Sequence, residues 1–175
     1  MAYTFAKAQG GKIGKSLVED EFLKTAQQII QKAKEKNVNL FLPSDTVIAD
    51  DFNNDAKRDV CPINAVPDGW IGMDIGPDAQ KKYAEVVSNS KTILWNGPMG
   101  VFEMSNFEEG TKIVATAVAE ATKNGGFSLI GGGDSVAAIN KYNLSDKMSY
   151  VSTGGGAMLE CLEGKVLPGV KAILE

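Results

Sequence analysis

Two runs of three glycines are the feature of this 175-residue sequence that most clearly suggests chemistry. Residues 131–133 and 154–156 each follow a short apolar segment typical of a β-strand, and each precedes a segment typical of a helix. Glycine lets backbone amides approach an anion closely, and the amino end of a helix adds a partial positive charge. One such corner would fit an ordinary tight turn equally well, but two in one small domain indicate a phosphorylated ligand.

A carboxylate follows the first of these glycine corners. Asp134 comes directly after Gly133, and a carboxylate beside a phosphate would repel it unless a cation lay between them. Mg²⁺ commonly bridges one or two carboxylates and the phosphates of a nucleotide. Asp134 is therefore a candidate magnesium ligand, while aspartate is also common as the N-cap of a helix. The spacing alone does not separate these two roles.

The segment 95–103 (Trp-Asn-Gly-Pro-Met-Gly-Val-Phe-Glu) forms a third cluster after a strand-like segment. Its glycines and proline predict a shaped loop, in which Phe102 offers an apolar surface and Glu103 a carboxylate. Acidic residues in nucleotide sites often accept hydrogen bonds from ribose hydroxyls. Taken alone, this segment fits a core phenylalanine and a surface glutamate equally well.

A glycine-rich segment near the start of the chain does not fit phosphate binding. Residues 10–16 (GGKIGKS) look like a P-loop, but that motif requires glycine at position 9, where the sequence has Gln9. The preceding segment is typical of a helix, whereas a P-loop follows a strand. We therefore set the P-loop interpretation aside.

The composition excludes several other classes of protein. The sequence has no histidine, which removes Ser-His and Cys-His nucleophile pairs and histidine-ligated metal sites. A net charge of -4 gives no general attraction for nucleic acid or anionic lipid. The distant Cys61 and Cys161 fit reduced thiols in a cytoplasmic protein, and we find no secretion signal or membrane-spanning apolar run.

The elements that would position these residues alternate between strands and helices. This alternation predicts an α/β fold with a three-layer, doubly wound parallel sheet of the Rossmann-like kind. The expected helices cover residues 2–9, 18–36, 107–123 and 157–162, and two more begin at Pro77 and at Asp134. The expected strands cover residues 38–43, 46–50, 91–95, 127–130 and 149–152, with an irregular segment at 51–68 and a glycine-punctuated apolar stretch at 69–76.

The clusters, in this order, resemble the carboxyl-terminal, nucleotide-binding part of the phosphoglycerate kinase family. The motifs WNGPMGVFE, GGGDS and STGGGA carry the resemblance, together with matching stretches at residues 1–5, 13–17, 42–43, 69–77 and 152–168. The resemblance covers essentially the whole chain. It implies reversible phosphoryl transfer between 1,3-bisphosphoglycerate and Mg-ADP, which gives 3-phosphoglycerate and ATP in glycolysis. This reaction needs no histidine, because its nucleophile is already ionised and catalysis reduces to positioning and charge neutralisation.

The resemblance also implies a role for each residue of the site. Adenine would be bordered by Gly72 and Met73, with Gly97, Met99 and Phe102 lining the same pocket, and Glu103 would hold the ribose. Asp134 would bind Mg²⁺, and Ser135 the phosphates of ATP or ADP. The phosphoryl group in transfer would be stabilised by the backbone amides of Gly132, Gly133, Gly154, Gly155 and Gly156.

The sequence departs from the family pattern in one respect. It lacks the phosphoglycerate-binding domain and the opening of the nucleotide-binding domain, which carries a lysine loop that grips the nucleotide phosphates. We therefore expect residues 1–175 to be a fragment of the nucleotide-binding domain, with Met1 an internal methionine and residues 167–170 close to the family's natural end.

Several expectations follow from this missing part. The sheet should have an exposed edge that favours self-association, 3-phosphoglycerate should bind only with the missing domain, and the chain alone should be inactive and bind Mg-ADP weakly or not at all. The alternative is a non-catalytic nucleotide-binding module, which would bind nucleotide without transferring phosphate.

Overall fold

The computed structural model describes residues 1–152 and 154–174, which form two compact units. The first unit contains Met1–Glu85 and Met99–Val114, and the second contains Val86–Pro98 and the chain from Ala115 onward. The chain passes between the units within α3 (Pro77–Ser88) and within α4 (Glu109–Lys123), as well as after Pro98.

A three-stranded antiparallel sheet organises the first unit. Strand β2 (Asp45–Ala49) lies between β3 (Arg58–Pro62) and β5 (Ile71–Ile75) and is antiparallel to both. Its β-branched residues suit a strand, and the Thr46 hydroxyl donates a 2.8 Å hydrogen bond to the carbonyl of Asp74 in β5. The carboxylate of Asp45 accepts the first amides of α3, from Asp78 and Ala79, so the strand also fixes the start of this helix.

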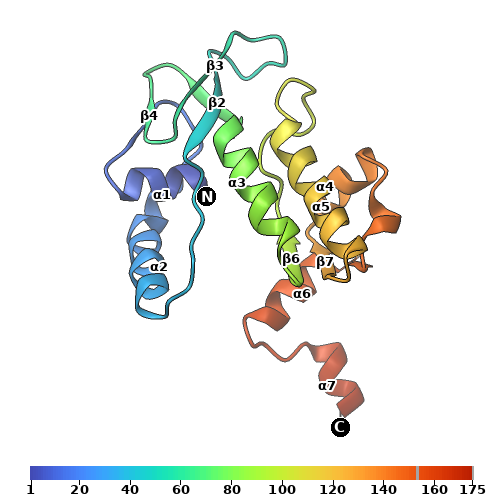
Figure 1. Cartoon of the computed structure of the whole chain (residues 1–175). Coiled ribbons are helices and arrows are strands. Elements are labelled where there is room, and N and C mark those ends of the chain that lie inside the picture. Colours follow the sequence, from blue (N-terminus) through green and yellow to red (C-terminus); the bar gives the residue numbers. More distant parts are fainter. Residues whose placement is uncertain (153, 175) are drawn as a thin grey trace. The chain divides into compact units, whose positions relative to one another are not determined.

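Smaller elements complete the first unit (Figure 1). Strands β1 (Lys12–Ile13) and β4 (Ala65–Val66) pair in parallel. Helix α1 (Ala2–Ala8) contacts α2 (Leu23–Glu35), which follows a short 3₁₀ turn at Asp20–Phe22. The core of this unit centres on Ala49, Met73 and Phe107, which are all buried.

A parallel sheet organises the second unit. Its strands are β6 (Thr92–Asn96), β7 (Phe127–Gly131) and β8 (Tyr150–Val151), in that order. Asn96 pairs with Gly131 at the ends of β6 and β7, so the carboxyl ends of these strands lie at the same edge of the sheet. Helix α5 (Gly133–Lys141) begins directly after β7, and α6 (Gly155–Leu162) begins shortly after β8.

The remaining described elements are a 3₁₀ turn at Ser145–Lys147 and a final helix, α7 (Pro168–Leu174). Within residues 1–152 and 154–174, no helix is long and apolar enough to cross a membrane.

The α/β class and the parallel sheet at the glycine corners are confirmed. The helices expected near residues 2–9, from Pro77 and near 107–123 all form. Strand β2 is also found where it was expected, but it belongs to an antiparallel sheet. The order of strands along the chain does not fix this direction, because it depends on which segments become neighbours.

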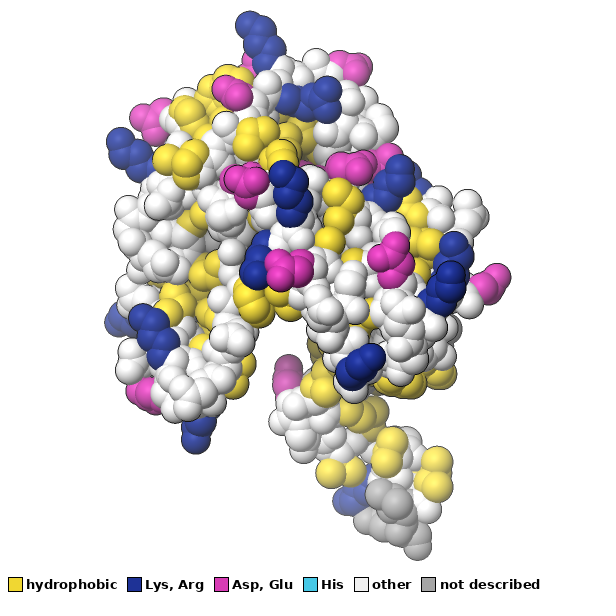
Figure 2. Space-filling model, in the orientation of Figure 1, with side chains coloured by type: hydrophobic (Ala, Val, Ile, Leu, Met, Phe, Trp, Pro, Cys, Tyr) yellow, Lys and Arg dark blue, Asp and Glu magenta, His cyan; other side chains and the backbone are white. Residues whose placement is uncertain are grey.

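The strand expected at residues 38–43 is wrong. This segment has no strand structure, and Val38, Leu40 and Phe41 are exposed. A strand requires a neighbour that pairs with its backbone, and no described strand pairs with this segment. Figure 2 shows hydrophobic side chains among the charged ones on one face of the surface.

Two further expectations for the first unit are also wrong. Residues 51–68 are not irregular throughout, because they contain β3 and β4. Strand β3 lies at the edge of its sheet with mostly exposed residues, so it lacks the apolar alternation from which strands are predicted. The apolar stripe expected on the helix over 18–36 buries only Ala26, whereas Phe22 and Ile29 are 48% and 43% exposed.

Candidate functional site

The two glycine corners of the second unit lie against each other. A Cβ atom added to Gly155 would lie 2.6 Å from the backbone nitrogen of Gly132 and 2.8 Å from its Cα. Gly132 itself has a positive φ of 84°, and a side chain there would overlap the Asn96 Oδ1 atom. Glycine is therefore required at both positions by close backbone packing.

Two glycines of these corners, Gly133 and Gly156, border open space. A Cβ atom added to Gly133 or to Gly156 would meet nothing within 4 Å. The N-cap residues of α5 and α6 are Gly132 and Gly154, and neither helix receives a side-chain capping hydrogen bond from its N-cap. The first amides of a helix have no partner within the helix, and they carry partial positive charge. Two such helix starts in contact through their glycines can together bind an anion.

The loop after β6 is tied to the first of these corners. Gly97, with a positive φ of 103°, donates its amide to the Ser135 hydroxyl at 2.6 Å. The Trp95 indole donates to the Gly97 carbonyl at 2.7 Å, which fixes the loop from its other side. Ser135 is fully buried, so its hydroxyl holds Gly97 in place. Its expected contact with phosphates stays a prediction.

Asp134 is exposed at the second position of α5. The N-cap of this helix is Gly132, so the alternative role of Asp134 as N-cap is wrong. Among the residues that the structure describes, no group of three or more aspartate, glutamate, cysteine or histidine residues could hold a metal ion. A cation at Asp134 would therefore take most of its ligands from water or from a bound phosphate, as Mg²⁺ commonly does.

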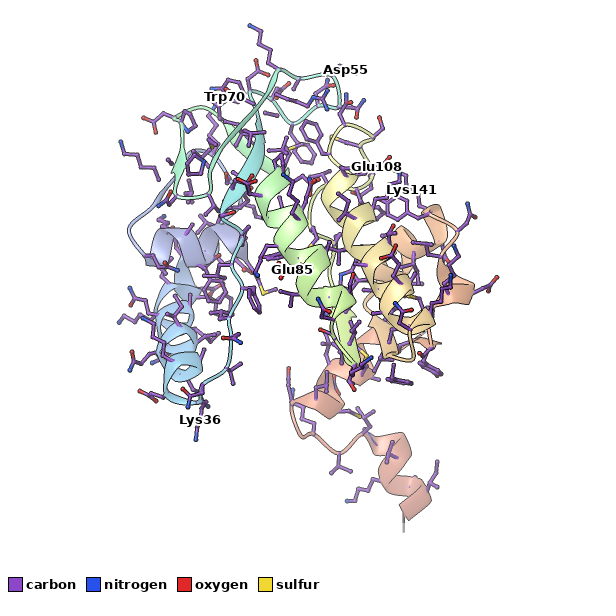
Figure 3. The ribbon with its side chains drawn as sticks, in the orientation of Figure 1. Lys36, Asp55, Trp70, Glu85, Glu108 and Lys141 are labelled. Atoms are coloured by element: carbon purple, nitrogen blue, oxygen red, sulfur yellow. The ribbon has the colours of Figure 1, made fainter. Side chains whose placement is uncertain are left out.

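The residues expected around adenine and ribose lie mainly in the first unit. Met73 is a core residue of β5, and its carbonyl accepts a 2.8 Å hydrogen bond from the amide of Val101. This bond joins β5 to residues 99–108, which we call the 99–108 loop and which carry Met99, Phe102 and Glu103. Phe102 is buried and Glu103 is exposed. Figure 3 labels Trp70 and Glu108, the residues immediately before β5 and α4.

Gly72 faces a tyrosine. A side chain at Gly72 would overlap the Tyr3 hydroxyl, which forms a 2.6 Å hydrogen bond with the Thr46 hydroxyl. The Gly72 amide donates to the Ser16 hydroxyl at 2.9 Å. Burial raises the pKa of Tyr3 to about 12, so this phenol stays neutral. Tyr3 and Ser16 thus fix Gly72 from two sides, and the role of Gly72 beside adenine stays a prediction.

The structure therefore brings the predicted residues together in two groups. The second unit joins Gly97, Ser135 and the two glycine corners, and the first unit joins the remaining residues of β5 and the 99–108 loop.

Sequence reasoning missed Asp74 in β5. This residue is 3% exposed, and its carboxylate accepts hydrogen bonds from the amides of Gly110 at 2.7 Å and Ile75 at 2.8 Å. Burial raises its pKa to about 7, against the opposing effect of these two hydrogen bonds. An aspartate inside the otherwise apolar stretch 69–76 is the signal that would have identified it, because a buried carboxylate needs partners.

Taken together, the parallel sheet and the paired glycine corners define an α/β protein with two helix starts in contact at the carboxyl edge of the sheet. The chain belongs to the phosphoglycerate kinase family, since the family's sequence model, "Phosphoglycerate kinase", matches residues 1–165. The chain is 60% identical over 173 residues to phosphoglycerate kinase from Porphyromonas gingivalis, covering 99% of the chain and 41% of that protein. It is 55% identical over 175 residues to a cytosolic phosphoglycerate kinase of Triticum aestivum, covering 100% of the chain and 44% of that protein.

Solved structures agree with this assignment. Phosphoglycerate kinase from Coxiella burnetii superposes with a TM-score of 0.92 at 52% identity, over 97% of this chain and 43% of that one. The enzyme from Pyrococcus horikoshii gives a TM-score of 0.80 at 30% identity, over 99% of this chain and 43% of that one. The chain thus spans about two fifths of the length of these relatives.

Proposed function

We propose that the chain supplies the nucleotide-binding part of a phosphoglycerate kinase, which transfers a phosphoryl group reversibly between 1,3-bisphosphoglycerate and Mg-ADP. Family membership supports this proposal. The structural observation that carries it is the contact between Gly132 and Gly155, because it places two uncapped helix starts side by side. We assign residues 1–175 to one nucleotide-binding domain of the longer enzyme.

The glycine corners would bind the phosphoryl group that is transferred. The amides of Gly132, Gly133, Gly154, Gly155 and Gly156 would donate hydrogen bonds to the phosphoryl oxygens, where negative charge is spread during transfer. Donors that are already fixed by packing need no reorganisation during the reaction, and Gly132 and Gly155 are fixed in this way. Ser135 would act on the phosphates indirectly, because its hydroxyl fixes the position of Gly97.

The residues of the first unit would bind the nucleoside. Gly72 and Met73 would border adenine through their backbone, because the Met73 side chain belongs to the core. Met99 and Phe102 would line the adenine pocket, and the exposed carboxylate of Glu103 would accept hydrogen bonds from the ribose hydroxyls.

Asp134 would hold Mg²⁺. Its carboxylate is exposed in the first turn of α5, next to glycines that border open space, which suits a cation bound jointly by a carboxylate and phosphates. When bound, Mg²⁺ neutralises charge on the nucleotide phosphates. The residues of the chain then need only to orient the phosphates, since the attacking oxygen is already ionised.

The chain on its own should not catalyse the transfer. The resemblance implies that phosphoglycerate binds to a domain that this chain does not cover. The lysine loop that grips the nucleotide phosphates also lies outside the part that the chain covers. We place the whole enzyme in the cytoplasm, as for the wheat relative that is named cytosolic. Self-association through the edge of β6, which pairs with β7 alone among the described strands, is a further part of the proposal.

A reconstitution assay tests this function. The chain is mixed with the portion of the Porphyromonas gingivalis enzyme that it does not cover, and ATP formation from 1,3-bisphosphoglycerate and Mg-ADP is measured. ATP formation that requires both parts supports the proposal. Nucleotide binding by the chain without any transfer by the mixture would favour the alternative, a non-catalytic nucleotide-binding module.

A further inference from the structure

The carboxylate of Asp74 contacts Gly100 near the start of the 99–108 loop and Gly110 in the first turn of α4, just after its end. At the far end, the amide of Gly110 donates to Asp74 Oδ2 at 2.7 Å. At the near end, Gly100 packs so closely that a Cβ atom there would overlap Asp74 Oδ1, and a Cβ atom at Gly110 would overlap the same oxygen. One buried carboxylate thus closes the loop, and glycine is needed on both sides of it.

Two further contacts attach the same loop. The buried Thr111 hydroxyl accepts hydrogen bonds from the amides of Met99 at 3.1 Å and Gly100 at 3.3 Å. The amide of Val101 donates to the carbonyl of Met73, the residue before Asp74 in β5. These bonds join the two ends of the loop to each other and to β5, with Asp74 at the junction.

We propose that Asp74 is a positioning residue that holds the 99–108 loop on β5 and thereby orients Phe102 and Glu103 for the nucleoside. The inference rests on the proposed function, because the loop matters for binding only if nucleotide binds there. Asp74 itself is buried and would act through this loop.

The surroundings of Asp74 disfavour the ionised form of its carboxyl group. Burial raises the pKa of Asp74, and the negative charge of Glu109 on α4 raises it further. Tyr3 on α1 also lies within electrostatic reach of Asp74. Burial of a charge disfavours a carboxylate at this position. A carboxylate nevertheless offers an acceptor oxygen to each of the two amides, those of Ile75 and Gly110.

The test compares Asp74→Asn with wild type and with Asp78→Asn, which changes an exposed aspartate of the same unit. Asparagine keeps the shape of the side chain but presents an amino group to one of the two amide donors. Hydrogen exchange of the chain alone should accelerate at least about tenfold across residues 99–110 in Asp74→Asn, as expected for one lost hydrogen bond to a charged group. Exchange across residues 127–141 should not change, and Asp78→Asn should match wild type. Equal exchange in Asp74→Asn and wild type would overturn the inference.

The reconstituted enzyme supplies a second readout. Asp74→Asn should raise the KM for ADP about tenfold with kcat nearly unchanged, whereas a merely unstable variant would lose kcat at constant KM. An unchanged KM for ADP would overturn the positioning role even if exchange accelerates. A wild-type mixture without activity would refute the proposed function, and the exchange experiment would still decide whether Asp74 holds the loop. If Asp74→Asn fails to fold, Gly110→Ala replaces it with the same expectations, because its methyl group disrupts the same contact.

Discussion

The backbone of Gly155 packs directly on that of Gly132, so the helix starts that follow two different strands meet at one point. Neither position tolerates a side chain, because Gly155 faces the backbone of Gly132 and Gly132 faces Asn96. This contact turns two separate glycine runs into one group of amide donors at the carboxyl edge of the parallel sheet.

The first prediction concerns this contact. In Gly155→Ala, the added methyl group would force the two corners apart, since it would lie 2.6 Å from the Gly132 nitrogen. We expect ATP formation by the reconstituted enzyme to fall at least about tenfold and the chain to lose about 1–3 kcal/mol of stability through overpacking. Gly169→Ala is the matched control, because a Cβ atom there meets nothing within 4 Å. Equal activity of the two variants would contradict the proposed role of the two glycine corners in phosphoryl transfer.

The second prediction concerns Asp134. Because this carboxylate is exposed, Asp134→Asn should change the free energy of unfolding by no more than about 0.5 kcal/mol. The reconstituted enzyme should nevertheless need more Mg²⁺ to reach half of its maximal rate. A magnesium titration of the rate measures this requirement, with Asp146→Asn, an exposed aspartate of the same unit, as the control. The same requirement in Asp134→Asn and in wild type would argue against magnesium binding by Asp134.

The third prediction concerns pH. The pKa of Asp74 is raised from 3.8 to about 7, so the folded chain binds this proton more tightly than the unfolded chain. Unfolding therefore releases a proton between pH 4 and 7, and the contribution of Asp74 to the free energy of unfolding falls as pH rises through that window. Asp74→Asn removes this dependence. Urea unfolding from pH 5 to pH 8 should show that the stability of the variant relative to wild type increases with pH, and a constant difference would contradict the raised pKa.

The fourth prediction concerns the edge of the parallel sheet. Among the described strands, β6 pairs with β7 alone, and Leu94 in β6 is 43% exposed. An unpaired edge with apolar side chains favours association with another chain. Sedimentation velocity of the chain alone should show concentration-dependent association that Leu94→Lys reduces. Leu17→Lys, a change at another exposed leucine, should leave it unaltered, and a strictly monomeric wild-type chain would refute this proposal.

The sequence predicts the second unit better than the first for a physical reason. Strands β6 and β7 are each followed by a glycine-containing turn, so the local pattern and the parallel pairing agree. In the first unit, the segment at 38–43 has the composition of a strand but no described partner. Strand β3 has a partner but not the expected composition. Strand formation there depends on which backbones meet, and this is not a local property of the sequence.

The site shows the same limit. Glycine runs and Asp134 are recognisable from the residue types and their order, but the contact between Gly132 and Gly155 depends on the register of three strands. Ser135 is recognisable as part of a motif, yet its hydroxyl bonds to Gly97, which lies 38 positions away. The role of Asp74 depends on the folding of the 99–108 loop back onto β5, which no local pattern indicates.

The most direct test of the central claim follows the backbone amide signals of the reconstituted enzyme by NMR while Mg-ADP is added. We predict that the amides of Gly132, Gly133 and Gly154–Gly156 shift in a saturable manner, with those of the 99–108 loop shifting alongside them. If Mg-ADP bound and shifted other amides while these glycine signals stayed unchanged, the assignment of the glycine corners as the phosphate site would be contradicted.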